Sequence, residues 1–244
     1  MKENKENYLK LYDKVVEYNK NHKKLTICPS IKGQYYDTCN NKIMVVGRAI
    51  NSWCPIEGSL GENETIIERL ERCERCTLDW VKGKNKWMYC NANNCPYAKD
   101  KQEDGKKNIT QFWRLVIHIC EKNNISDEDW YKNIVWTNLY KASYQEGGNP
   151  SNGFCASQKD VCNSILINEI EEYKPQKIYF ITETNGREER NWFCKKDFGE
   201  VYKKLENSGI EVFVLTRPEG HKIEKIYNSK QDIYGNITKD SNEN

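Results

Sequence analysis

The chain has 244 residues, with 38 Lys and Arg against 36 Asp and Glu, so its formal net charge is only +2. This balance excludes a strongly basic protein that holds nucleic acid through charge alone, and any contact with DNA then requires a local basic patch. No stretch reaches the roughly 18 apolar residues of a membrane span, and the first twenty residues lack the apolar run of a signal peptide. We therefore expect a cytoplasmic protein without a membrane partner.

Predicted helices and strands alternate along the chain, as judged from apolar spacing and from short β-branched or aromatic runs. In chain order they are a helix over 7–19, a strand over 43–46, a helix over 64–77, a helix over 109–120, a strand over 134–139, a helix over 157–173, a strand over 177–182, a helix over 190–206 and a strand over 211–216. This alternation predicts an α/β protein of three-layer α/β/α form, with a central, mostly parallel four-stranded sheet. We expect one domain over residues 1–226 and a disordered tail over 227–244.

Polar residues follow each of the four predicted strands. Because open parallel sheets bind ligands at the carboxyl ends of their strands, these residues are expected to share one rim. They are Gly47, Arg48 and Asn51 after the first strand, Asn138 and Lys141 after the second, Thr182 and Glu183 after the third, and Arg217 and His221 after the fourth. Each is also explained as a solvated loop residue when taken alone.

Two central stretches carry a family resemblance. They are IVWTNLYKASYQEGGNPS (134–151) and CASQKDVCNSILINEIEEYKPQKIYFIT (155–182), in which a strand ends in Asn, Lys follows three residues later, and Asn-Pro, a helix, Pro-x-Lys and a further strand come next. This order resembles the uracil-DNA glycosylase superfamily, most closely its iron-sulfur branch, family 4, and uncharacterised relatives. GRAINSW (47–53) resembles the first glycosylase motif, and LTRPEGH (215–221) lies where the second motif falls.

The resemblance implies an enzyme that hydrolyses the N-glycosidic bond of uracil, or of another damaged or modified base in DNA, as in base excision repair. Such an enzyme extrudes the base from the helix, which costs least in single-stranded or mismatched DNA. Asn138 matches the Asn that reads the base, since one amide donor and one acceptor pair with uracil and mismatch cytosine. The alternative is that Asn138 caps its strand by bonding the loop backbone. No cofactor is required for this chemistry.

The first motif departs from many relatives at its third position, where Ala49 replaces Asp or Asn, as it does in the iron-sulfur branch. The remaining polar candidates are Arg48, for phosphate or base, and Asn51, for water or the backbone. Trp53 is a candidate for stacking on the extruded base, although it also fits simple packing. Gly47 permits a tight turn in either case.

The second motif departs further, because Arg217 stands where the family has a His that donates to the leaving base. A permanently charged guanidinium can stabilise that anion, and His221 is a second candidate. The alternative is a surface Arg beside a turn at Pro218. We assign catalysis to Arg217, His221 and Asn51 and base binding to Gly47, Arg48, Trp53, Asn138 and Lys141, and we expect Asn138, Arg48 and Arg217 to surround one pocket.

Eleven cysteines, an odd number, argue against a disulfide framework in a cytoplasmic protein. Ala142 follows Lys141 where the iron-sulfur branch has a cluster ligand, so an iron-sulfur cluster is not predicted in its family position. Four cysteines within an insertion of about 73–108 have a spacing that suits a structural zinc ion, namely Cys73, Cys76, Cys90 and Cys95. The alternative is that Cys73 and Cys76 pack as small apolar residues on one helix.

Two other functions stay open. A catalytically inactive module of the same fold that binds a nucleobase or nucleic acid is favoured by the altered positions Ala49 and Arg217, and it would bind DNA without releasing a base. An enzyme acting on a free nucleoside or nucleotide would bind that small molecule and no DNA.

Overall fold

The structure is a computed structural model, and it describes residues 4–18, 25–49, 110–125, 130–144, 150–183, 192–218 and 222–233. The helices in these ranges are α1 (Lys5–Tyr18), α3 (Gln111–Lys122), α4 (Asn152–Tyr173), α5 (Lys195–Glu206) and α6 (Ile223–Asn228). The strands are β1 (Leu25–Ile27), β2 (Ile31–Lys32), β3 (Ile43–Ala49), β4 (Ile134–Tyr140), β5 (Ala142–Tyr144), β6 (Lys177–Glu183), β7 (Glu211–Thr216) and β8 (Gln231–Asp232).

The main sheet has six described strands in the order β2-β4-β3-β6-β7-β8. Its inner strands β4, β3, β6 and β7 pair in parallel, whereas β2 and β8 pair antiparallel at the two edges. The α/β class expected from the sequence is confirmed, but the sheet is mixed and has more strands than the four predicted. Each edge strand is two residues long, which is too short to show a period in the sequence.

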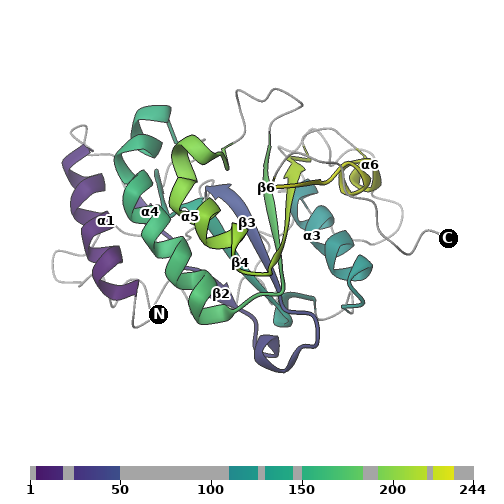
Figure 1. Ribbon diagram of the computed structural model, residues 1–244. Coiled ribbons are helices and arrows are strands. Elements are labelled where there is room, and N and C mark those ends of the chain that lie inside the picture. Colours follow the sequence, from purple (N-terminus) through teal and green to yellow (C-terminus); the bar gives the residue numbers. More distant parts are fainter. Residues whose placement is uncertain are drawn as a thin grey trace.

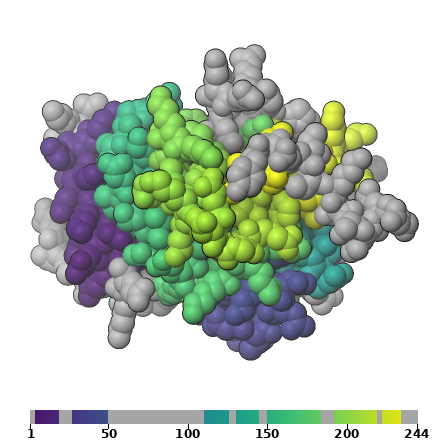
Figure 2. All heavy atoms as spheres, in the orientation of Figure 1, coloured from purple at the N-terminus to yellow at the C-terminus, as the bar shows by residue number. Residues whose placement is uncertain are grey.

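Helices cover both faces of this sheet, with α4 and α5 on one side and α3 and α6 on the other (Figure 1). Alternate residues of β3 supply the two cores, because successive side chains of a strand point to opposite faces. Met44 and Val46 pack toward α4 and α5, and Ile43 and Val45 pack toward α3. Helix α1 lies outside α4, and the two helices and α5 form one continuous face of the molecule (Figure 2).

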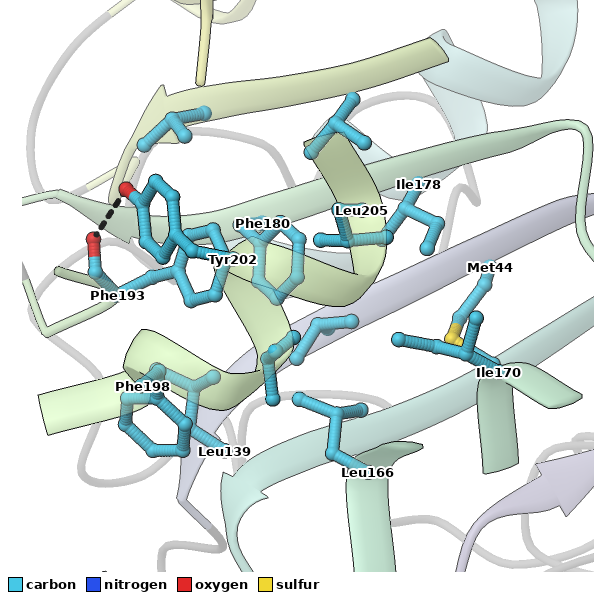
Figure 3. Close-up of a cluster of buried hydrophobic side chains, with 14 of the residues drawn as sticks. Met44, Leu139, Leu166, Ile170, Ile178, Phe180, Phe193, Phe198, Tyr202 and Leu205 are labelled. Atoms are coloured by element: carbon cyan, nitrogen blue, oxygen red, sulfur yellow. Dashed lines mark hydrogen bonds between the residues drawn. The ribbon is translucent and has the colours of Figure 1, made fainter. Parts of the chain in front are cut away.

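The core on the α4 and α5 side is rich in aromatic rings (Figure 3). Phe193 stacks on Phe180 with ring centroids 3.6 Å apart and on Tyr202 with centroids 4.5 Å apart. The Tyr202 hydroxyl donates a hydrogen bond to the Phe193 carbonyl oxygen at 3.3 Å. These contacts hold the chain in a non-helical conformation just before α5, which explains why this helix begins at Lys195 and not at residue 190 as predicted.

Two further expectations differ from the structure. Strand β3 continues through Gly47 to Ala49 instead of stopping at the glycine, because Gly47 pairs with Asn138 of β4. Residues 227–233, expected in a disordered tail, form the end of α6 and β8, and Tyr227 is buried.

The predicted helix over 64–77 and the cysteine-rich insertion lie outside the described residues. Among the described helices, none has the length and apolar character to cross a membrane.

Candidate functional site

The order of the parallel strands indicates where a ligand would bind. Among the four parallel strands β3 comes first in the chain, β4 pairs on one side of it, and β6 pairs on the other side. Ligands of open α/β sheets bind at such a switch point, beyond the carboxyl ends of the strands. Here the ends of β4, β3, β6 and β7, which we call the carboxyl rim, lie at the top of Figure 1, at the end of the sheet where α4 begins.

Asn138 and Gly47 are direct partners in the ladder between β4 and β3. A Cβ atom built on Gly47 would lie 2.5 Å from the Asn138 Oδ1 atom and 3.6 Å from a ring carbon of Phe112. The Asn138 amide therefore extends across Gly47 on the α3 face of the sheet, and only a glycine leaves room for it. Asn138 is 4% exposed, so its donor and acceptor are largely shielded from water.

Arg48 points the other way, toward α4 and α5, because it continues the series of Met44 and Val46 along β3. Its guanidinium carbon lies 3.2 Å from the ring centre of Trp192, and its Nη2 donates to the Pro150 carbonyl oxygen at 3.2 Å. Arg48 is 8% exposed. Burial lowers the pKa of Arg48, and the nearby positive charge of Arg217 lowers it further.

Arg217 follows β7 at the same rim, and it is half-buried. Its backbone N–H donates to the Glu183 carbonyl oxygen at 2.8 Å, while the Thr216 hydroxyl donates to a Glu183 carboxylate oxygen at 2.9 Å. The ends of β6 and β7 are thus joined, and Arg217 lies close enough to Arg48 for their charges to interact. Arg48 and Arg217 therefore both lie at the carboxyl rim.

The expected single pocket of Asn138, Arg48 and Arg217 requires a correction. Gly47 and Arg48 are consecutive residues of β3, so the Asn138 amide on the Gly47 side and the Arg48 guanidinium lie on opposite faces of the sheet. The carboxyl rim therefore carries two distinct groups, a buried amide on the α3 face and the Arg48 guanidinium stacked on Trp192 on the α4 and α5 face.

Lys141 lies inside the protein. It is completely buried, and its Nζ donates to Glu169 Oε2 at 2.7 Å and also to the Thr137 hydroxyl. The Tyr8 hydroxyl donates to the other oxygen of Glu169 at 3.5 Å. Through Thr137, Glu169 and Tyr8 these hydrogen bonds join β4, α4 and α1. The Lys141 charge, assigned from the sequence to base binding, is therefore directed to Glu169 and not to the rim.

The other residues predicted for the site lie outside the described ranges: Asn51, Trp53, His221, Cys73, Cys76, Cys90 and Cys95. Within the described ranges, no three metal-binding side chains gather in one place. Burial raises the pKa of the Cys155 thiol to about 11 and that of Cys162 to about 12. Both therefore stay protonated at neutral pH.

Trp192 and the start of α4 are parts of the rim that the sequence did not reveal. The helix is 22 residues long, and its first turn contains no acidic residue. Ser151 caps it, with its hydroxyl oxygen accepting from the Phe154 N–H at 3.2 Å. The Pro150 carbonyl that accepts from Arg48 immediately precedes this cap. Trp192 falls inside the helix predicted over 190–206, so the sequence pattern gave no sign of its place at the rim.

No protein-family model matches the chain, and the search of curated proteins also found no match.

Proposed function

We propose that the protein is a uracil-DNA glycosylase-like protein that binds an extruded base of DNA beside Asn138 and hydrolyses its N-glycosidic bond. The observation that carries this proposal is the Asn138 amide, held across Gly47 at the carboxyl end of β4. The sequence resemblance assigns base reading to this same asparagine. Its place at the rim of a sheet with a parallel centre is where ligands of such sheets bind.

The chemistry of the amide suits uracil. Its N–H group donates to a uracil carbonyl oxygen, and its carbonyl oxygen accepts from the uracil ring N–H, whereas cytosine offers the opposite pattern. Because Asn138 is buried, a mismatched partner would leave polar groups unpaired away from water, and this penalty gives the discrimination its strength.

The hydrolytic step requires groups that stabilise the departing anionic base. We assign this role to Arg217 and His221, as the second glycosylase motif implies. The proposed substrate is single-stranded or mismatched DNA, since a base is extruded from these at the lowest cost.

A second candidate is a catalytically inactive nucleobase or nucleic-acid binding module of the same fold. The specific observation in its favour is that Arg48 points away from Asn138, so these two groups cannot act on one atom of a bound base. Under this alternative the protein binds uracil-containing DNA and leaves the glycosidic bond intact.

The two candidates are separated by incubating the protein with oligonucleotides that contain uracil or hypoxanthine, single-stranded and mismatched, followed by alkali. The glycosylase proposal expects strand breaks with the wild type and at most background with Asn138→Ala. The matched control is Asn207→Ala, which removes an exposed amide that bonds only the Lys203 carbonyl among the described residues. Retained DNA binding without breaks in the wild type supports the binding module.

The four cysteines of the insertion carry a separate proposal, a closed structural zinc site that plays no part in the chemistry. Elemental analysis of the purified protein is expected to find about one zinc atom per chain. Neither zinc nor iron near that level would end this proposal, and it would leave the assignment of Asn138 untouched.

A further inference from the structure

The stack of Arg48 on Trp192 contains buried hydrogen-bond donors that lack acceptors. A guanidinium has five N–H donors, and Arg48 Nε, although buried, has no partner among the described residues. The indole Nε1 of Trp192, directly beneath that guanidinium, is also buried and unpaired there. A buried donor without an acceptor destabilises the folded protein, and here two such donors share one stack.

The surroundings of this stack favour a negative charge. Arg217 adds a second cation near Arg48. The amino end of α4, next to Pro150 and Ser151, carries the positive end of a long helix dipole and no acidic residue in its first turn. The Asp197 carboxylate, which lies near this region, pairs with Lys159 at 3.4 Å.

Two unpaired donors, a buried guanidinium and a helix amino end together match a ligand that has several acceptor oxygens and at least one full negative charge. A phosphoryl group has this chemistry, and planar guanidinium groups bind it with good geometry. A neutral base or an apolar ligand would leave the buried charge of Arg48 uncompensated.

We propose that Arg48 and Trp192 form a binding site for a phosphoryl group at the amino end of α4, on the face of the sheet opposite Asn138. The phosphoryl group comes either from a nucleic-acid strand or from a free nucleotide. The first source rests on the proposed function, and the second is independent of it. In both cases the ligand supplies the acceptors that Arg48 Nε and Trp192 Nε1 lack.

The test is isothermal titration calorimetry with four probes: inorganic phosphate, deoxyuridine monophosphate, a short single-stranded oligonucleotide with a 5′-phosphate, and the same strand without it. Arg48→Gln removes the stacked cation and is expected to weaken binding of phosphorylated probes by about ten- to a hundredfold. Trp192→Phe keeps the ring beneath Arg48 but removes the N–H, and a loss of about two- to tenfold is expected. Lys203→Gln, which removes an exposed charge on α5, is the matched control and should bind like the wild type.

The probes separate the two sources. Tighter binding of either oligonucleotide than of the free phosphates identifies a nucleic-acid strand, and equal or tighter binding of the free phosphates identifies a small ligand. The proposal is overturned if the phosphorylated probes do not bind the wild type, or if they bind wild type, Arg48→Gln and Trp192→Phe with equal affinity. Circular dichroism establishes that each variant is folded. Since no base is released in these titrations, their outcome is independent of whether the protein is a glycosylase.

Discussion

The side-chain amide of Asn138 lies across the backbone of Gly47, its partner in the parallel ladder of β4 and β3. The glycine therefore has a role beyond permitting a turn, because its missing side chain creates the space in which the amide sits. The proposed base-reading residue and the first residue of the first glycosylase-like motif are one structural unit.

Gly47→Ala is expected to displace the Asn138 amide, because the new Cβ would lie 2.5 Å from its oxygen. Inserting a methyl group into such a packed position costs about 1–3 kcal/mol of stability, and base binding should fall with the loss of the amide position. Gly199→Ala is the matched control, since nothing lies within 4 Å of its Cβ position. Urea unfolding and uracil-DNA binding of both variants check this, and equal behaviour of the two would contradict it.

Lys141→Met is expected to destabilise the protein by about 3–5 kcal/mol, because it leaves the buried Glu169 carboxylate without its cation. Combining it with Glu169→Gln should restore much of that loss, since the glutamine is neutral and still accepts from the Tyr8 hydroxyl. The free energy of unfolding in urea measures both. Two additive losses would show that the pair is not coupled.

His118 is expected to make stability depend on pH. Burial, including packing against Tyr227, lowers its pKa below the ordinary value of 6.5. The unfolded chain therefore takes up the proton first, so stability is full above pH 6.5 and falls as the pH drops toward the lower folded pKa. His118→Gln should reduce the dependence of the unfolding free energy on pH between about pH 7 and pH 5. An unchanged slope in this variant would contradict the assignment.

Phe193→Ala is expected to cost about 3–5 kcal/mol, because the ring is fully buried between Phe180 and Tyr202. It should also weaken phosphate binding, since Phe193 fixes the chain at Trp192. Phe193→Leu leaves a smaller cavity than Phe193→Ala, so it should lose less stability and less affinity for phosphate. A Phe193→Ala variant with a lower free energy of unfolding but wild-type affinity for phosphate would show that this core does not position the proposed site.

The sequence predicted the longer helices and strands well, because a long apolar pattern indicates the same element whatever it packs against. The helices α1, α3 and α4 and the strands β4, β6 and β7 all lie near their predicted ranges. The edge strands β2 and β8 were not predicted, because their two residues become strands only by pairing with β4 and β7.

The candidate site was predictable as a set of strand ends but not in its geometry. That Asn138 and Gly47 share the rim follows from parallel strands. Arg48 points to the face opposite Asn138 because β3 stays pleated through residue 48. The sequence predicted that this strand would end at Gly47. The stack of Arg48 on Trp192 joins segments distant in the sequence, and no local pattern encodes such a contact.

The central claim is that Asn138 reads a nucleobase, and the measurement that tests it most directly is the release of free base from DNA, quantified by mass spectrometry with enzyme in excess. Wild type and Asn207→Ala are expected to release uracil from single-stranded DNA, and Asn138→Ala should not. Asn138→Asp, which replaces the amide donor with an acceptor, should lose uracil and gain preference for cytosine. Equal release of uracil by wild type and Asn138→Ala, or no release of any base by the wild type, would contradict the proposed enzyme.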